Sequence, residues 1–131
     1  MLSAIDDSPK ESSGAMDYYR EVAGTPDRSA QLAIGVTHAP YLRILQAMSS
    51  DDLDVIFAGH THGGQVRLPW PGGSKALTTN CDLPHWRARG VTKIKDEPWL
   101  NVSAGMGTSP FARIRVASPP EASLITLEAS L

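Results

Sequence analysis

Two short apolar runs separated by an amphipathic stretch constrain the fold of this 131-residue chain more than any other feature. Residues 32–36 (Leu-Ala-Ile-Gly-Val) and residues 54–58 (Asp-Val-Ile-Phe-Ala) have the length and character of buried strands. Between them, apolar side chains recur at helical spacing from Tyr41 to Met48, which predicts a helix that begins near Pro40. Strand, helix and strand in this order form a βαβ unit, so we expect two parallel strands and a right-handed crossover.

The part of the chain after Gly59 has a different pattern, in which short runs alternate with glycine and proline. The fold class is therefore α/β with a tendency toward α+β at the C-terminus, that is, a βαβ core followed by mostly antiparallel strands. Residues 1–30 lack a sustained apolar period and are expected to be a loop-rich, partly ordered segment with one short helix at 16–22. Residues 31–131 are then the single domain. The further strands are predicted at residues 65–68, 76–79, 99–103 and 123–127.

Composition and charge narrow the range of functions. The chain carries 12 Lys and Arg against 14 Asp and Glu, a net charge of −2 at pH 7, whereas a general nucleic-acid binder needs a basic surplus. No apolar run approaches the roughly 20 residues of a membrane span, and no signal peptide precedes the first acidic residues. The single cysteine, Cys81, excludes an internal disulfide. We therefore expect neither a nucleic-acid partner nor a membrane span in this chain.

Three histidines follow the two predicted parallel strands. His38 comes directly after the first strand, and His60 and His62 follow the second. Because neighbouring strands lie about 4.8 Å apart and ligands bind beyond the carboxyl ends of such strands, the imidazoles are expected at one edge of the sheet. Imidazole is a good ligand for Zn, Mn, Fe and Ni, and Gly63 and Gly64 let the backbone approach a metal or phosphate closely. The alternative is that each histidine is only a polar strand-end residue, bonded to water or backbone.

The residues around these histidines resemble a known family. Residues 35–40 (GVTHAP) and residues 58–65 (AGHTHGGQ) are similar to the last two motifs of the calcineurin-like metallophosphoesterases. The second string and its extension through Pro69 resemble a branch of bacterial phosphohydrolases often found near the cell envelope. Residues 101–127 are similar to the C-terminal end of those proteins. Localisation therefore stays open between the cytoplasm and the cell envelope.

This resemblance implies a phosphoester hydrolase on a four-layer αββα fold, of which this chain would supply roughly half. His38 and His60 would bind the second of two divalent metal ions (Mn, Zn, Fe or Ni) and His62 the first, and the ions would polarise the phosphoryl group and supply a bridging hydroxide. The family's N-terminal motifs, which are an Asp-x-His pair, a Gly-Asp-x-x-Asp pair and a Gly-Asn-His string, do not occur here, and residues 55–81 hold no carboxylate. No catalytic set is complete in this chain. We expect it to be inactive alone, and to need self-association or an N-terminal half that carries the remaining ligands.

Weaker predictions concern the glycines and one arginine. The candidates for contact with the substrate phosphate are Gly63, Gly64, Gly105, Gly107 and, as charge partner, Arg115. The alternative for the later residues is an ordinary turn and a solvated strand. A structural zinc or a nucleophile pair at Cys81 and His85 is disfavoured, because Pro84 opposes a regular helix there and no second cysteine exists. The alternative function is a non-catalytic remnant, a binding or interaction domain with at most one loosely bound metal.

Overall fold

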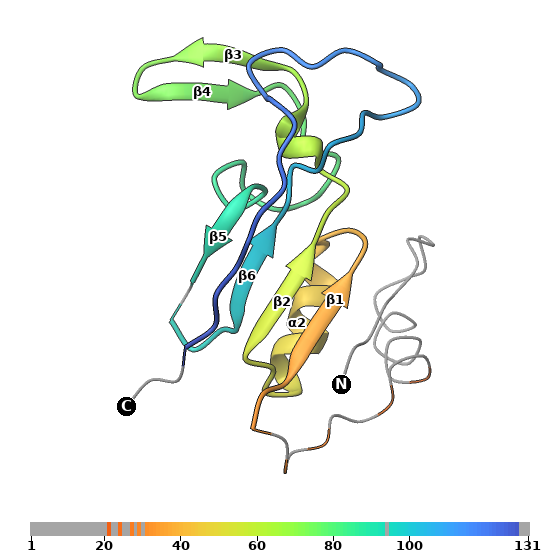
Figure 1. Cartoon of the computed structure of the whole chain (residues 1–131), viewed down its shortest axis with the longest axis vertical. Helices are drawn as coiled ribbons and strands as arrows, with labels where there is room; N and C mark the ends of the chain where they lie inside the picture. The colour runs from red at the N-terminus through yellow and green to blue at the C-terminus, as the bar shows by residue number, and fades with distance from the viewer. Residues whose placement is uncertain are drawn as a thin grey trace.

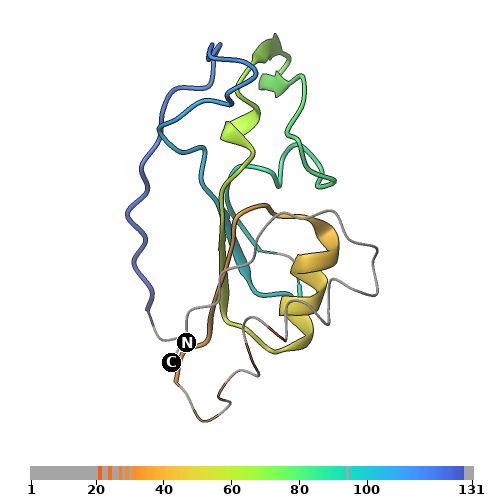
Figure 2. The same ribbon diagram turned by 90° about the vertical axis from the view of Figure 1, so that its right-hand side faces the viewer.

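One four-stranded sheet with a helix on one face forms the body of the protein (Figures 1 and 2). The computed structural model describes residues 31–93 and 95–128, together with residues 21, 24, 27 and 29. The α/β fold class is confirmed. The predicted helix at 16–22 lies outside the described residues except for Glu21, and the division at residue 30 stays a prediction. In order across the sheet the strands are β1 (Ile34–Thr37), β2 (Val55–Ala58), β6 (Trp99–Val102) and β5 (Gly90–Thr92), and the helix is α2 (Leu42–Ser50).

The βαβ unit predicted from the sequence is present. β1 and β2 pair in parallel, with Thr37 opposite Ala58 at their carboxyl ends. α2 begins two residues after Pro40, where the Asp82 carboxylate accepts a hydrogen bond from the Leu42 N–H at 2.8 Å. A Cβ on Gly35 would lie 2.7 Å from a Leu53 methyl carbon and 3.2 Å from the Met48 sulfur, so a larger residue in β1 would displace side chains packed under the helix.

The main sheet is more parallel than the sequence suggested. β6 pairs in parallel with β2, and only β5 runs antiparallel, against β6. The prediction of mostly antiparallel strands after the βαβ core agrees with the pairing of β5 with β6, whereas the parallel pairing of β6 with β2 was not expected. The reason is that the chain between β2 and β6 returns to the end of the sheet at which β2 begins. Such a long-range path is not encoded by local turn residues.

The remaining strands form a separate hairpin, β3 (Arg67–Trp70) and β4 (Gly73–Ala76). The predicted strands at 65–68 and 76–79 are thus displaced by two or three residues. Pro69 does not end β3, because a two-stranded ribbon has edges on which a missing N–H costs no ladder bond. The chain bends after β4, where the Leu77 N–H donates to the Val66 carbonyl at 3.0 Å.

The predicted strand at 123–127 is wrong. Residues 119–128 contain no strand or helix and run across the sheet on the side opposite α2 (Figures 1 and 2). A segment that lies over a face cannot pair with the backbone of the sheet, whose hydrogen bonds point sideways in its plane. Its short run of apolar and β-branched residues therefore predicted a strand for which no neighbouring edge is available.

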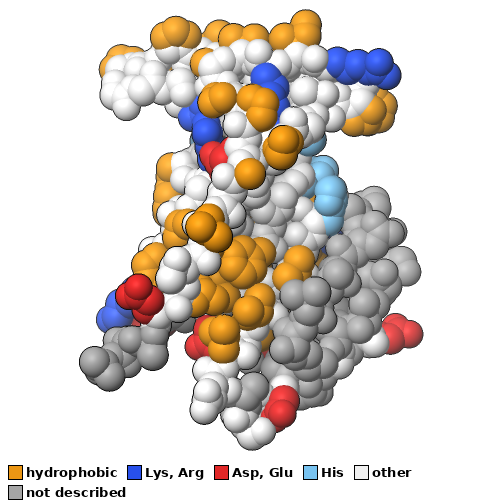
Figure 3. Space-filling model, in the orientation of Figure 1, with side chains coloured by type: hydrophobic (Ala, Val, Ile, Leu, Met, Phe, Trp, Pro, Cys, Tyr) orange, Lys and Arg blue, Asp and Glu red, His pale blue; other side chains and the backbone are white. Residues whose placement is uncertain are grey.

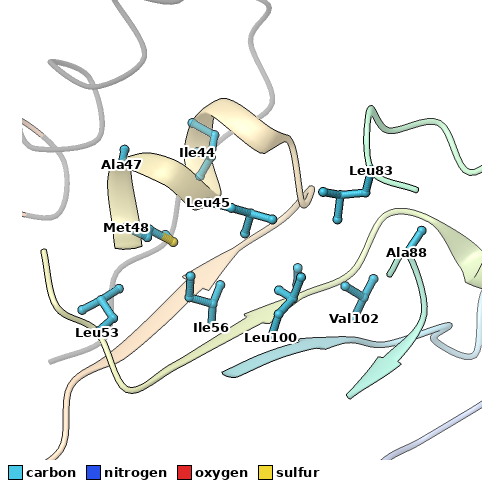
Figure 4. Close-up of a cluster of buried hydrophobic side chains, with 11 residues drawn as sticks. Ile44, Leu45, Ala47, Met48, Leu53, Ile56, Leu83, Ala88, Leu100 and Val102 are labelled. Atoms are coloured by element: carbon cyan, nitrogen blue, oxygen red, sulfur yellow. The ribbon is translucent and has the colours of Figure 1, made fainter. Parts of the chain in front are cut away.

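The hydrophobic core lies between α2 and the sheet. Figure 4 shows helix side chains directed at the side chains of β2 and β6, and two further residues, Leu83 and Ala88, close one end. Met48, Ile56, Leu100 and Val102 are at most 1% exposed. Truncating one of these larger residues to Ala typically costs about 2–5 kcal/mol. This core fixes the sheet whose carboxyl edge carries the histidines.

The opposite face of the sheet is only partly covered. A groove of about 1320 Å³ lies there, and its lining includes Val55, Val91 and Trp99 from the sheet, with Leu124 and Leu127 from the C-terminal segment. Val91 and Trp99 are half exposed. Within the described residues, no helix is both long and apolar enough to cross a membrane.

Candidate metal centre

The carboxyl ends of three parallel strands meet at one edge of the sheet. Thr37, Ala58 and Val102, the last residues of β1, β2 and β6, are in register. The loops that follow them carry His38, the glycine-rich histidine string at residues 59–65, and residues 103–107. Figure 3 shows histidine side chains exposed beside the narrow region above the sheet. The topology thus gathers the loops that the sequence analysis singled out.

His38 and His60 are in direct contact. His60 Nδ1 lies 3.1 Å from His38 Nε2, and the rings meet edge to face with centroids 5.0 Å apart. His60 Nε2 lies 3.1 Å from the backbone carbonyl of Asn80. Because a carbonyl can only accept, this contact assigns the ring proton to Nε2 and turns the lone pair of Nδ1 toward His38. A carbonyl that accepts from the second ring nitrogen is the usual arrangement around a metal-ligating histidine.

Asn80 is a contributor that the sequence analysis missed. Its backbone has a positive φ of 51°, a conformation that asparagine tolerates better than most residues. The turn is held by Thr78, whose hydroxyl accepts from the Asn80 N–H and donates to its side-chain oxygen, both at 3.3 Å. The Thr-Thr-Asn run marks a turn, but nothing in it indicates that a carbonyl would point at His60.

The backbone of the histidine string is strained. His60, His62 and Gln65 have φ values of 67°, 50° and 25°, in the region that favours glycine. Such conformations cost about 1–3 kcal/mol each and concentrate at functional sites. Gly63 and Gly64 continue the left-handed path with φ of 65° and 76°. The strain is an observation independent of residue type, and a functional role of this loop stays a prediction.

The two glycines of the string are required by packing. A Cβ on Gly63 would lie 2.8 Å from Ser118 Oγ and 2.9 Å from Ala104 Cβ. A Cβ on Gly64 would lie 2.2 Å from Ala76 Cβ at the end of β4. Gly105 has a φ of 62° in open space, and Gly107 is exposed. A role of any of these four glycines in substrate binding stays a prediction.

His62 begins a short 3-10 turn (His62–Gly64) and interacts electrostatically with both His60 and His38. Burial lowers its pKa below 6.5, electrostatic interactions with Arg115, His60 and His38 lower it further, and a hydrogen bond with the Gly107 backbone partly opposes them. In the part of the chain that the structure describes, no group of three or more His, Cys, Asp or Glu residues is arranged to hold one metal ion. The structure thus joins His38 to His60 and leaves the metal role of all three as a prediction.

Arg115 joins the segment after β6 to the histidine string. Its Nη1 donates to the carbonyls of His62 at 3.2 Å and Ser118 at 3.1 Å. Its Nη2 donates to the carbonyl of Ala104 at 2.7 Å, and its Nε to that of Gly107 at 3.0 Å. Contact with a substrate phosphate stays a prediction. The contacts in the structure are those of an arginine that fixes the position of His62 and of the 104–107 loop.

Further bonds tie the same two segments together. Gln65, at the end of the histidine string, accepts from the Ser109 N–H at 2.8 Å and donates to the Ala112 carbonyl. The buried Ser118 hydroxyl donates to the His62 carbonyl at 3.1 Å. Glu121 accepts from Arg89 at 3.1 Å, and this pairing lowers its pKa although burial acts in the opposite direction. Residues 104–121 therefore support the loop that carries His60 and His62.

The alternative centre at Cys81 and His85 gains no support. The Cys81 thiol donates to the Thr79 hydroxyl at 3.4 Å, while Leu83 between the two residues is buried in the core. Asp82 serves the first turn of α2. This segment has a packing role next to the core.

Comparisons with known proteins give three relatives. The chain is 40% identical over 76 residues to the UDP-2,3-diacylglucosamine pyrophosphatase LpxG of Chlamydia trachomatis, which is 55% of this chain and 22% of the relative. LpxG of Chlamydia muridarum is 40% identical over 72 residues, 52% of this chain and 21% of the relative. The uncharacterized protein YpbG of Bacillus subtilis is 32% identical over 126 residues, 96% of this chain and 41% of the relative.

The chain spans less than half the length of each of these curated relatives. No family model matches it, and no solved structure matches it. By sequence, this chain is therefore similar to a part of two pyrophosphatases and to a part of YpbG.

Proposed function

We propose that this chain is the histidine-bearing, C-terminal part of a metal-dependent hydrolase that cleaves phosphoester or pyrophosphate bonds. The observation that carries the proposal is His60, held between His38 and the Asn80 carbonyl with 3.1 Å to each. The similarity to two UDP-2,3-diacylglucosamine pyrophosphatases supports a substrate with a phosphate linkage. The resemblance of the GHTHGGQ string to calcineurin-like metallophosphoesterases narrows the proposal to that superfamily.

The donor set fits a divalent ion such as Mn, Zn, Fe or Ni. His38 and His60 would hold one ion through facing ring nitrogens, and His62 would be a ligand of a second. A bound ion of this kind polarises a phosphoryl oxygen and lowers the pKa of a bound water. The chain itself orients the ligands: the Asn80 carbonyl fixes the tautomer of His60, and Arg115 fixes the backbone of His62.

The site needs groups that lie elsewhere. Residues 55–81 carry no Asp or Glu, whereas two-metal hydrolytic centres use carboxylates to balance charge and bridge the ions. We propose that these carboxylates come from an N-terminal half or from a second copy of the chain. Assays of this chain with p-nitrophenyl phosphate and added Mn are expected to give no turnover above background.

Metal titration tests the proposal. Calorimetry with Zn or Mn should give weak binding by the wild type and loss of binding by His60→Ala. His85→Ala is the matched control, since His85 is an exposed histidine outside the site. Equal metal binding by wild type and His60→Ala would contradict the metal site. In the p-nitrophenyl phosphate assay, turnover that disappears in His62→Ala would contradict the view that this chain lacks part of the catalytic ligand set.

A second candidate function rests on the groove of about 1320 Å³ over the open sheet face. In that reading the chain is a non-catalytic interaction domain with at most one loosely bound metal, and the groove receives a partner. Weak metal binding is compatible with both functions, so partner affinity is the measurement that separates them: the interaction domain would keep its partner affinity in the His60→Ala variant.

A further inference from the structure

The region above the sheet contains two arms that are joined to each other. We call them the upper bar: residues 66–77, which include the β3–β4 hairpin, and residues 105–117 (Figure 1). The arms are linked where the Arg67 N–H donates to the Val116 carbonyl and the Val116 N–H donates to the Gln65 carbonyl, both at 2.9 Å. The bar is therefore one connected surface.

The upper bar exposes large apolar side chains. Figure 3 shows hydrophobic side chains spread along it, next to a few cationic ones. Phe111 is 97% exposed and Trp70 60%. Large apolar side chains exposed in several groups on one region are a feature of interaction surfaces. The other large apolar residues on it that are about half exposed or more include Leu68, Leu77, Met106 and Ile114.

The charge of the upper bar has one sign. Its only charged residues are the cations Arg67, Lys75, Arg113 and Arg115, and no Asp or Glu occurs in either arm. Lys75 and Arg113 are exposed, whereas Arg67 and Arg115 donate to backbone carbonyls. The Lys75 ammonium lies 5.1 Å from the centre of the Trp70 ring, so a cation and an aromatic face are presented together.

Exposed aromatic side chains with neighbouring cations, and no carboxylates nearby, favour attachment to an anionic lipid surface. The apolar side chains enter the boundary between headgroups and acyl chains, and the cations remain at the lipid phosphates. The single sign of the charge favours an anionic partner, and the exposed apolar side chains favour a lipid surface over a soluble polyanion. We infer that the upper bar docks this chain on an anionic lipid surface, with Trp70 and Phe111 inserted and with Lys75 and Arg113 at the headgroups. The inference does not depend on the proposed hydrolase activity.

Vesicle flotation without added metal tests this inference. Wild type is expected to bind vesicles of phosphatidylcholine with phosphatidylglycerol and to bind phosphatidylcholine vesicles much more weakly. The double variant Trp70→Ala/Phe111→Ala should lose about tenfold or more in affinity. Trp86→Ala is the control, because Trp86 is as exposed as Trp70 (64% against 60%) and lies outside the bar.

The cations are tested separately. Lys75→Gln and Arg113→Gln should each lower affinity for anionic vesicles about fivefold, while Lys93→Gln, an exposed lysine outside the bar, should not. Failure of the wild type to bind anionic vesicles would overturn the inference. So would equal losses in the Trp70/Phe111 and Trp86 variants, or binding to soluble polyglutamate that matches binding to vesicles. All substituted side chains are exposed, so the variants should keep the wild-type melting temperature, which is the check on folding.

Discussion

Replacement of Arg115 by Met should loosen the loop that carries His62. The guanidinium donates to the carbonyls of His62, Ala104, Gly105 and Ser118 over 2.7–3.2 Å. A hydrogen bond to a charged group contributes about 1.5–3 kcal/mol, but these bonds share one cation and the carbonyls regain water on opening. We therefore expect Arg115→Met to lose about 2–4 kcal/mol of the free energy of unfolding. A domain of this size is stable by about 5–15 kcal/mol, so the variant should still fold.

Urea unfolding followed by circular dichroism measures this loss. Arg115→Lys should recover only part of the stability, since an ammonium cannot reach carbonyls on several sides as the planar guanidinium does. Arg113→Met is the matched control two residues away; Arg113 is exposed, so its removal should change stability by about 0.5 kcal/mol or less. A loss in Arg115→Met no larger than in Arg113→Met would refute the bracing role.

Three further predictions concern pH and assembly. The pKa of Glu121 is lowered below 4.5, because the hydrogen bonds from Arg89 and the Ala104 N–H outweigh burial. The contribution of Glu121 to the free energy of unfolding should be present above pH 4.5 and be lost as the pH falls through the folded-state pKa. Glu121→Gln should flatten that part of the pH–stability curve. The pKa of His62 is lowered from 6.5, so an NMR titration of the metal-free chain should show it protonating below pH 6.5; a midpoint above 6.5 would contradict the burial argument. The groove beside Val91 and Trp99 should be covered by a second copy in solution, and a monomer by sedimentation equilibrium at tens of micromolar would exclude this.

The βαβ unit could be predicted because its signals are local. The helical spacing from Tyr41 to Met48 and the apolar runs on either side require only neighbouring residues. The direction of β6 and the absence of a strand at 123–127 could not be predicted in this way. Both depend on which edge or face of the sheet the returning chain reaches, and a short apolar run has the same sequence whether or not a partner strand is available.

The candidate site likewise contains features with a local sequence signal and features that depend on tertiary structure. The proximity of His38 and His60 could be predicted, because the loops that follow two parallel strands in register lie at one edge of the sheet. The Asn80 contact could not, since a backbone carbonyl carries no signature of residue type. Arg115 is a third case, because a guanidinium can donate to phosphate oxygens or to carbonyl oxygens, and the residue type alone does not say which it meets. Only the path of residues 104–118 around the histidine string gives it carbonyls to bind, so its role depends on tertiary structure.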